Sequence, residues 1–176
     1  FKARGAYLGI HGMSSYEKSK GVIAASGGNH ALAVAWAAKK AGVSAKIAMP
    51  KATDPIRING CHTLGAEIIL CSDIADAFST METFSIDEDR TIMHPFEGRH
   101  MTLGSATCGV EFVTAHPDID VFIIPVGGGG LISGMATAIK LIKPEAIVIG
   151  VEPFGADSMF QSLKVGQPVK LDQVTT

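Results

Sequence analysis

The alternation of short apolar segments with longer segments of helical period is the feature that most constrains the fold of this chain. The predicted strands, rich in Val and Ile, cover residues 22–26, 45–50, 66–71, 91–95, 121–126 and 146–151. The predicted helices between them cover residues 29–41, 55–64, 74–86, 100–115 and 131–142. Strands of this composition separated by helices of about 10–15 residues are typical of βαβ units. The sequence therefore predicts an α/β fold with parallel strands flanked by helices.

Charge and cysteine content narrow the classes of ligand. The formal net charge is -2 and Lys and Arg form no tract, which argues against nucleic acid or an anionic membrane surface as a partner. No apolar run approaches the ~18 residues that a membrane span needs. The three cysteines, Cys61, Cys71 and Cys108, are odd in number and lack metal-ligand spacing. These features predict reduced thiols, a cytoplasmic location and a small molecule as the ligand.

The segment A-S-G-G-N-H at 25–30 is the first candidate binding site. It directly follows a predicted strand and opens a predicted helix, the place where parallel sheets bind ligands. Gly27 and Gly28 let backbone N–H groups converge, while Asn29 and His30 add an amide and an imidazole. The alternative is an ordinary strand-to-helix turn with Ser26 or Asn29 as the helix N-cap.

Four successive glycines, Gly127, Gly128, Gly129 and Gly130, form the second candidate site after the most apolar predicted strand. Four glycines are costly in conformational entropy, and a phosphate cradle of backbone N–H groups is a physical reason to keep them. A tight turn is the plain alternative.

A nicotinamide-binding fingerprint is a competing interpretation of this region. Gly128, Gly130 and Gly134, followed by Glu152, approximate its spacing, although Ser133 stands where the third glycine is expected. This interpretation leaves the segment at 25–30 unexplained.

The segment E-P-F-G-A-D-S at 152–158 is the third cluster. Glu152 ends a predicted strand, and with Asp157 it offers oxygen ligands of the kind that Mg²⁺ or Ca²⁺ prefers. The alternative for Asp157 is an N-capping role at a helix start.

Taken in order, four motifs carry a family resemblance: F-K-A-R-G-A at 1–6, S-G-G-N-H at 26–30, the tetraglycine, and V-E-P-F-G-A-D at 151–157. They resemble the pyridoxal-phosphate-dependent serine/threonine dehydratases and serine racemases, which have the two-lobed fold type II of the tryptophan-synthase β-subunit. H-P-F-E-G at 94–98 also falls where that family often has a similar segment. The resemblance covers essentially the whole chain.

The resemblance implies specific residue roles. Lys2, which alone would be taken for a solvated surface lysine, matches the Schiff-base lysine that also acts as general base. Asn29 matches the residue that hydrogen-bonds the hydroxyl on the cofactor ring, and Gly127 to Gly130 match the phosphate-binding loop. The remaining residues of the first segment are expected to bind the substrate: Ser26, Gly27, Gly28 and His30.

Two departures from the family pattern bear on the reaction. Racemases have a serine at the position of Gly27, where it serves as acid/base on the face opposite the lysine, so Gly27 favours elimination over racemisation. At 103–107, L-G-S-A-T replaces the usual G-Q-G-T. The resemblance therefore implies a lyase that removes water from threonine, serine or a related 3-hydroxy amino acid and releases a 2-oxo acid and ammonia.

The metal site of racemase-like members is only partly matched. Glu152 and the carbonyl of Ala156 fit it, while Ser158 stands where a second carboxylate is expected and Asp157 is its neighbour. A Mg²⁺ or Ca²⁺ ion is thus left open.

The resemblance also implies a domain organisation. We expect a small lobe at residues 21–96 and an incomplete large lobe formed by residues 1–20 and 97–176, with the segment at 94–100 as the crossing. Family members are about twice as long, so the chain is interpreted as an internal fragment of a homo-oligomeric dehydratase. An inactive, truncated remnant is the alternative from a different functional class.

Overall fold

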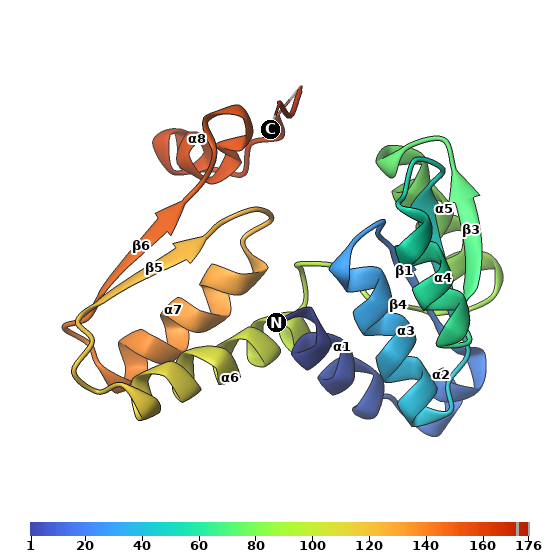
Figure 1. Ribbon diagram of the computed structural model, residues 1–176, viewed down its shortest axis with the longest axis horizontal. Coiled ribbons are helices and arrows are strands. Elements are labelled where there is room, and N and C mark those ends of the chain that lie inside the picture. Colours follow the sequence, from blue (N-terminus) through green and yellow to red (C-terminus); the bar gives the residue numbers. More distant parts are fainter. Residues whose placement is uncertain (172, 176) are drawn as a thin grey trace. The chain divides into compact units, whose positions relative to one another are not determined.

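The computed structural model describes residues 1–171 and 173–175 (Figure 1). Contacts along the chain divide it into two compact units, Phe1–Gly104 and Ser105–Thr176. Helix α6 (Arg99–Ala115) contains the point of division. Each unit is described separately below.

A parallel sheet organises the first unit. Its strands are β1 (Val22–Ala25), β2 (Ala45–Pro50), β3 (Glu67–Cys71) and β4 (Thr91–Ile92), and their order in the sheet is β3-β2-β1-β4. Val22 pairs with Ala45 on one side and Thr91 on the other, so β1 is a central strand. All four residues of β1 are buried, as expected for a strand covered on both faces.

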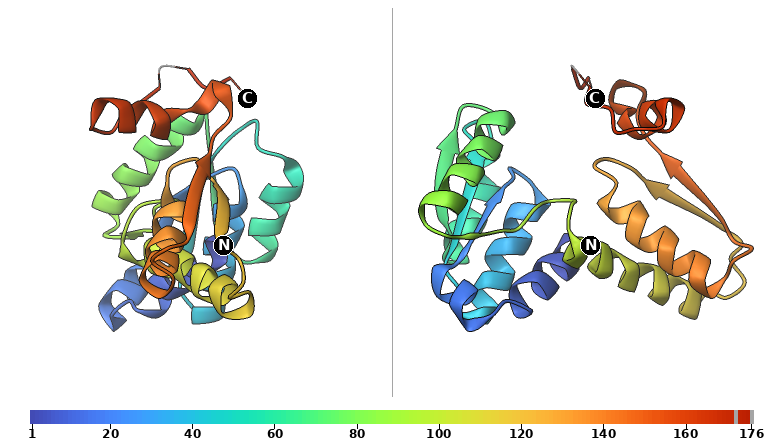
Figure 2. Two further views of the ribbon diagram at one scale, coloured as in Figure 1. Left: turned by 90° about the vertical axis from the view of Figure 1, so that its left-hand side faces the viewer. Right: turned by 180° about the vertical axis from the view of Figure 1, so that it is seen from behind.

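Helices cover both faces of this sheet, as Figure 2 shows from two further directions. One apolar cluster joins one face of β1 and β2 to α1 (Lys2–His11), α3 (Asn29–Ala41) and α4 (Pro55–Thr63). A second cluster joins the other face to α5 (Ile74–Asp87). The short helix α2 (Ser15–Lys20) begins with a capping box formed by Ser14 and Glu17.

Two glycines allow α1 to lie directly against the first part of α6. A Cβ atom added at Gly104 would stand 2.4 Å from the backbone nitrogen of Gly5 and 2.6 Å from its Cα. A Cβ at Gly5 would meet the sulfur of Met101 at 2.4 Å. Because any side chain at Gly104 would collide with backbone, this crossing fixes where α1, and with it Lys2, can lie.

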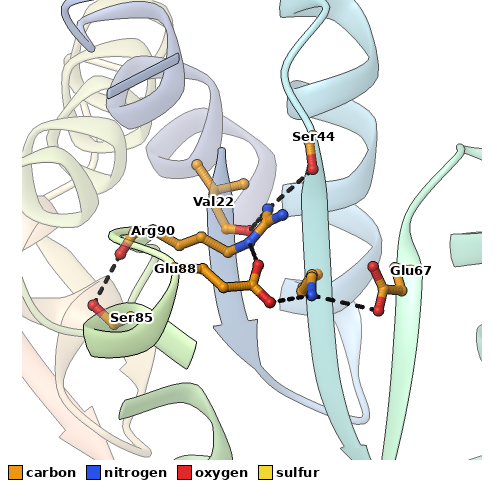
Figure 3. A network of polar contacts seen from close by, with 7 residues as sticks. Val22, Ser44, Glu67, Ser85, Glu88 and Arg90 are labelled. Carbon is orange, nitrogen blue, oxygen red and sulfur yellow. Dashed lines mark hydrogen bonds and ion pairs between the residues drawn. The ribbon is translucent and has the colours of Figure 1, made fainter. Parts of the chain in front are cut away.

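A network of charges lies at the amino ends of the strands (Figure 3). Lys46 Nζ on β2 pairs with Glu88 at 2.6 Å and with Glu67 at 3.5 Å, while Arg90 Nε donates to the second oxygen of Glu88 at 2.6 Å. The Arg90 guanidinium also donates to Ser44 Oγ at 3.0 Å. These contacts connect the segment before β4 to β2 and β3.

The second unit is built on a smaller parallel sheet. Strands β5 (Val121–Pro125) and β6 (Ile147–Val151) are joined by α7 (Gly130–Ile142), and the 3-10 turn η1 (Phe154–Ala156) and helix α8 (Ser158–Val165) follow. Phe122 and Ile124 face α7 in a small core, whereas the alternate residues Ile123 and Ile149 are 69% and 44% exposed.

The strands and long helices agree with the sequence prediction, apart from shifts at their ends and a much shorter β4. Helices α1, α2 and α8 were not predicted. The proposed lobe boundaries at 21–96 stay a prediction, since the two compact units are defined by contacts within this chain and do not test where the lobes begin and end. Within the described residues, no helix is long and apolar enough to cross a membrane.

Candidate functional site

The turn from β1 into α3 presents a helix start without a side-chain cap. The N-cap is Gly28, with φ -126° and ψ -151°, and within the described chain no side chain caps it. Ser26 Oγ instead accepts the Gly28 N–H at 3.0 Å and so closes the turn. The capping alternative for Ser26 and Asn29 is therefore wrong: Asn29 is the first residue of the helix. The uncapped N–H groups at this helix start suit an anionic ligand.

Asn29 has an exposed side chain whose orientation depends on a neighbouring arginine. Arg57 on α4 donates to Asn29 Oδ1 over 3.4 Å. Since the carbonyl oxygen is turned to the guanidinium, the amide nitrogen of Asn29 remains a donor for another group. Sequence reasoning missed Arg57, because nothing in the sequence indicates that α4 lies beside this turn.

Lys2 is the first residue of α1, and its amine donates to the backbone carbonyl of Pro95. Burial lowers the pKa of this amine below its ordinary value. Lys2 and Asn29 line one open hollow of about 410 Å³ in the first unit. The other lining residues are apolar: Phe1, Ala3, Leu32, Ala33, Trp36 and Leu64. The structure thus brings together two residues that lie 27 positions apart in the sequence.

The imidazole of His30 is not presented to this hollow. It is 2% exposed, and Nε2 lies 2.7 Å from the backbone oxygen of Met93. Burial lowers its pKa to about 4, and Lys2, His94 and His100 act in the same direction through their charges. The prediction that His30 binds substrate is therefore restricted to its backbone.

The tetraglycine lies in the second unit, between β5 and α7. Gly129 is the N-cap in the left-handed region, with φ 80°, and Gly130 is the first residue of the helix. No side chain among residues 1–171 and 173–175 caps this helix, and a Cβ at Gly127 would meet nothing within 4 Å. Glycine is required at Gly129 by its backbone conformation, and the open N–H groups at the helix start are of the kind that binds phosphate.

The acidic residues near the end of β6 are engaged in hydrogen bonds within the chain. The two carboxylate oxygens of Glu152 accept the N–H groups of Met159 and Phe160, each at 2.8 Å, at the start of α8. Asp157 Oδ2 accepts from the Gln161 side chain at 2.9 Å. Glu152 thus caps the start of α8, a structural role that accounts for an acidic residue at this position without a nicotinamide fingerprint.

The comparisons with known proteins agree with these features. A family profile described as "Pyridoxal-phosphate dependent enzyme" matches residues 1–176. The chain belongs to this family. The cradle of glycine N–H groups fits a phosphate, and a partly buried lysine fits a carbonyl cofactor, so the donor set in each unit suits pyridoxal phosphate.

The similar sequences include a dehydratase and an ammonia-lyase. Phenylserine dehydratase from Ralstonia pickettii is 43% identical over 171 residues, which cover 97% of this chain and 52% of the relative. L-threonine ammonia-lyase from Thermotoga maritima is 41% identical over 98% of this chain and 43% of the relative. The chain of this pyridoxal-phosphate-dependent enzyme thus spans about half the length of the curated relatives it matches.

Solved structures show the same fold type. The processed form of threonine deaminase isoform 2 from Solanum lycopersicum matches with a TM-score of 0.95 and 41% identity, covering 99% of this chain and 51% of that one. A maize serine racemase matches with a TM-score of 0.94 and 34% identity, covering 99% and 53%. The predicted fold class, the α/β fold of type II pyridoxal-phosphate enzymes, is confirmed, and the chain covers about half of each of these structures.

The predicted metal site and the altered segment at 103–107 complete the predicted features. Among the described residues no group of three His, Cys, Asp or Glu side chains could hold a metal ion, and the set of Glu152, Ala156, Asp157 and Ser158 stays a prediction. In the altered segment at 103–107, Ser105 is 1% exposed, and its hydroxyl has no hydrogen-bond partner in the described chain.

Proposed function

We propose that the protein to which these residues belong is a pyridoxal-phosphate-dependent ammonia-lyase acting on a 3-hydroxy amino acid. It removes the α-proton and the β-hydroxyl as water, and hydrolysis of the product gives a 2-oxo acid and ammonia. The observation that carries the proposal is the pairing of Lys2, with its lowered amine pKa, and Asn29 in one hollow. The names of the similar dehydratases support it.

Each group of residues has a distinct task in this proposal. Lys2 holds the cofactor and takes the substrate α-proton at Nζ, a role for which burial, by lowering the pKa of this amine, prepares it. When bound, the cofactor ring supplies the electron sink for negative charge at the α-carbon. Asn29 donates its amide hydrogen to the ring oxygen.

The two uncapped helix starts bind anions. The N–H groups of Gly127 to Gly130 hold the cofactor phosphate, because a helix N-terminus carries partial positive charge. In the turn of Ser26, Gly27, Gly28 and His30, the N–H of Ser26 donates to Ala48 and that of Gly28 to Ser26 Oγ. The N–H groups of Gly27 and His30 are therefore the ones that hold the substrate carboxylate at this helix start.

Elimination is favoured over racemisation by the surroundings of Gly27. A Cβ added there would stand 2.5 Å from Thr53 Oγ1, so the place of a side chain at this position is taken by Thr53. Racemisation needs an acid/base group on each face of the α-carbon. The similarity to serine racemases at 34% and 31% identity keeps racemisation as the second candidate.

Further proposals concern the whole protein. We infer a homo-oligomer in the cytoplasm, with a small amino acid as substrate and no nucleic acid or membrane as a partner. Residues 21–96 form the small lobe, and residues 1–20 with 97–176 belong to the large lobe. The net charge of -2 supports the absence of polyanionic partners.

The test is an ammonia-release assay on the full gene-encoded protein with a panel of threonine, serine, phenylserine and 3-hydroxyaspartate, with and without Mg²⁺. We expect release with at least one substrate and an absorbance band of bound cofactor that Lys2→Ala abolishes. Lys39→Ala, at an exposed lysine of α3, is the control and keeps both. A wild-type protein without the band would overturn the proposal, whereas a band with chiral inversion and no ammonia would favour the racemase.

A further inference from the structure

His30 is a buried histidine whose protonation is defined by one contact. Its Nε2 lies 2.7 Å from the backbone oxygen of Met93, and a carbonyl oxygen only accepts hydrogen bonds. The proton must therefore be on Nε2. Nδ1 is then an acceptor, and it has no partner within the described part of the chain. His30 is thus committed to Met93 through a single strong hydrogen bond.

That bond holds one end of the segment 93–97, which leaves the sheet after β4. The Met93 N–H donates to Ile23 of β1 at 2.8 Å, while the Met93 carbonyl is held by His30. At the other end, the Glu97 N–H donates to His94 Nδ1 at 3.0 Å and closes the segment into a turn. Both ends of the segment are therefore restrained.

Lys2 contacts the middle of this restrained segment. Its amine donates to the carbonyl of Pro95, two residues beyond the one held by His30. Proline has no backbone N–H to offer, so the carbonyl is the backbone group by which Pro95 binds a partner. Its position, and with it the position of the Lys2 amine, depends on how the segment is held.

We propose that His30 is a positioning residue for Lys2: by holding Met93, it places the Pro95 carbonyl as the acceptor for the Lys2 amine when that amine is not bound to cofactor. The proposal rests on the proposed function only for the catalytic role of Lys2. The contact chain runs from α3 through the segment 93–97 to α1, three parts of the sequence that the fold brings together.

The chemistry of the proposed reaction gives this arrangement a purpose. An amine that has taken up a proton needs an acceptor, and a neutral carbonyl binds an ammonium group without the strong pairing that a carboxylate would bring. The pKa of His30 near 4 means that its imidazole stays neutral at working pH, so its bond to Met93 persists throughout.

Competitive trace acetylation of the cofactor-free, full-length protein tests the proposal directly. The acetylation rate of each lysine, measured by mass spectrometry, reports how free its amine is. In His30→Asn, whose shorter side chain cannot reach Met93, we expect Lys2 to react about fivefold faster, the factor by which one ordinary hydrogen bond shifts an equilibrium. In His30→Gln, whose amide nitrogen can replace Nε2, Lys2 should react at the wild-type rate.

Lys46 provides an internal control for folding. It lies at the opposite end of the same sheet, paired with Glu88, so a general loss of structure would increase the acetylation rates of both Lys46 and Lys2. If His30→Asn unfolds in this way, His94→Ala serves as the second test. This variant removes the acceptor of the Glu97 N–H, and His94 is partly exposed, so the fold should tolerate the change. Lys2 should then react faster, and His94→Asn, which keeps an acceptor for the Glu97 N–H, should restore the wild-type rate.

Unchanged Lys2 reactivity in a folded His30→Asn or His94→Ala variant would overturn the proposal. In the cofactor-loaded enzyme, the same variants should increase the isotope effect of an α-deuterated substrate, which a purely structural residue would not change. The labelling result does not depend on turnover. If the wild-type protein forms no cofactor band, the proposed function fails, whereas a normal band with unchanged labelling refutes only the role of His30.

Discussion

The two ends of the first sheet treat their polar groups in opposite ways. At the amino end, Lys46, Glu88 and Arg90 lie within 2.6 Å of an opposite charge (Figure 3). At the carboxyl end, Lys2 donates to a neutral carbonyl, and the buried Nδ1 of His30 has no partner in the described residues. Both ends belong to the same strands, so the sheet itself does not cause the difference.

The difference indicates which end of the sheet stabilises the fold and which end carries the groups for the proposed reaction. Paired charges contribute to folding, whereas a desolvated amine and an unsatisfied imidazole nitrogen reduce stability. The pKa of Glu88 is lowered by hydrogen bonds from Lys46 and Arg90, while those of Lys2 and His30 are lowered chiefly by burial. The comparison would be wrong if mutations at the amino end abolished activity while mutations at the carboxyl end changed only the stability.

The largest expected effect is on activity at the carboxyl end. In the full-length protein, Lys2→Ala should reduce turnover by about 10³-fold or more, because it removes both the cofactor link and the general base. Its unfolding midpoint in urea should change little, since Lys2 is an end residue of α1. Ammonia release and the fluorescence of Trp36, the single tryptophan, measure the two quantities. Wild-type turnover in the variant would contradict the assignment of Lys2.

Acid should destabilise the carboxyl end before the amino end. A histidine pKa that falls from 6.5 in the unfolded chain to about 4 in the fold means that the unfolded state binds more protons. The free energy of unfolding therefore has its full value above pH 6.5 and declines by about 3 kcal/mol as the pH falls to about 4. His94 and His100, whose pKa values are also lowered by burial, act in the same direction.

Urea unfolding at a series of pH values measures this decline. His30→Gln should flatten the profile between pH 6.5 and 4, because glutamine does not titrate. The contribution of Glu88, whose pKa is lowered, should be lost only at more acidic pH. An equally steep profile in His30→Gln would show that other groups are responsible.

A mutation at the amino end should affect stability and leave chemistry unchanged. Lys46 has a side chain that is 11% exposed, and Lys46→Ala leaves Glu88 and Glu67 without this partner. We expect the free energy of unfolding to fall by about 1.5–3 kcal/mol, the range for a hydrogen bond to a charged group. The cofactor absorbance band should persist. Lys39→Ala is the exposed control, and an equal loss in both variants would remove the special role of Lys46.

The smallest effect concerns the space beside Gly27. Gly27→Ser should destabilise the first unit by about 1 kcal/mol, because the new Cβ would displace the Thr53 side chain. The double variant Gly27→Ser, Thr53→Ala should recover the loss. Thermal unfolding of the four proteins in this cycle gives the coupling between the two positions. Additive effects would mean that Thr53 does not occupy the place of a side chain at 27.

Local patterns were sufficient for much of the fold. The strand β2 and the helix α3 match their predicted bounds, because the period of apolar residues that indicates a strand or a helix can be recognised from neighbouring residues alone. Helices α1, α2 and α8 escaped prediction. The first contains two glycines, which lower helix propensity, and its position depends on the close approach of Gly104 to Gly5.

The sequence by itself determined the chemical groups of the site: a lysine in F-K-A-R-G-A, an amide in S-G-G-N-H and a run of four glycines, the last two each between a predicted strand and a predicted helix. Only the tertiary structure decided how these groups are held. It placed Arg57 against Asn29, the Pro95 carbonyl against Lys2, and Met93 against His30, and it turned Glu152 into a helix cap. The reason is that residue type and spacing specify what a side chain can do, while burial and partners distant in sequence set its charge and orientation.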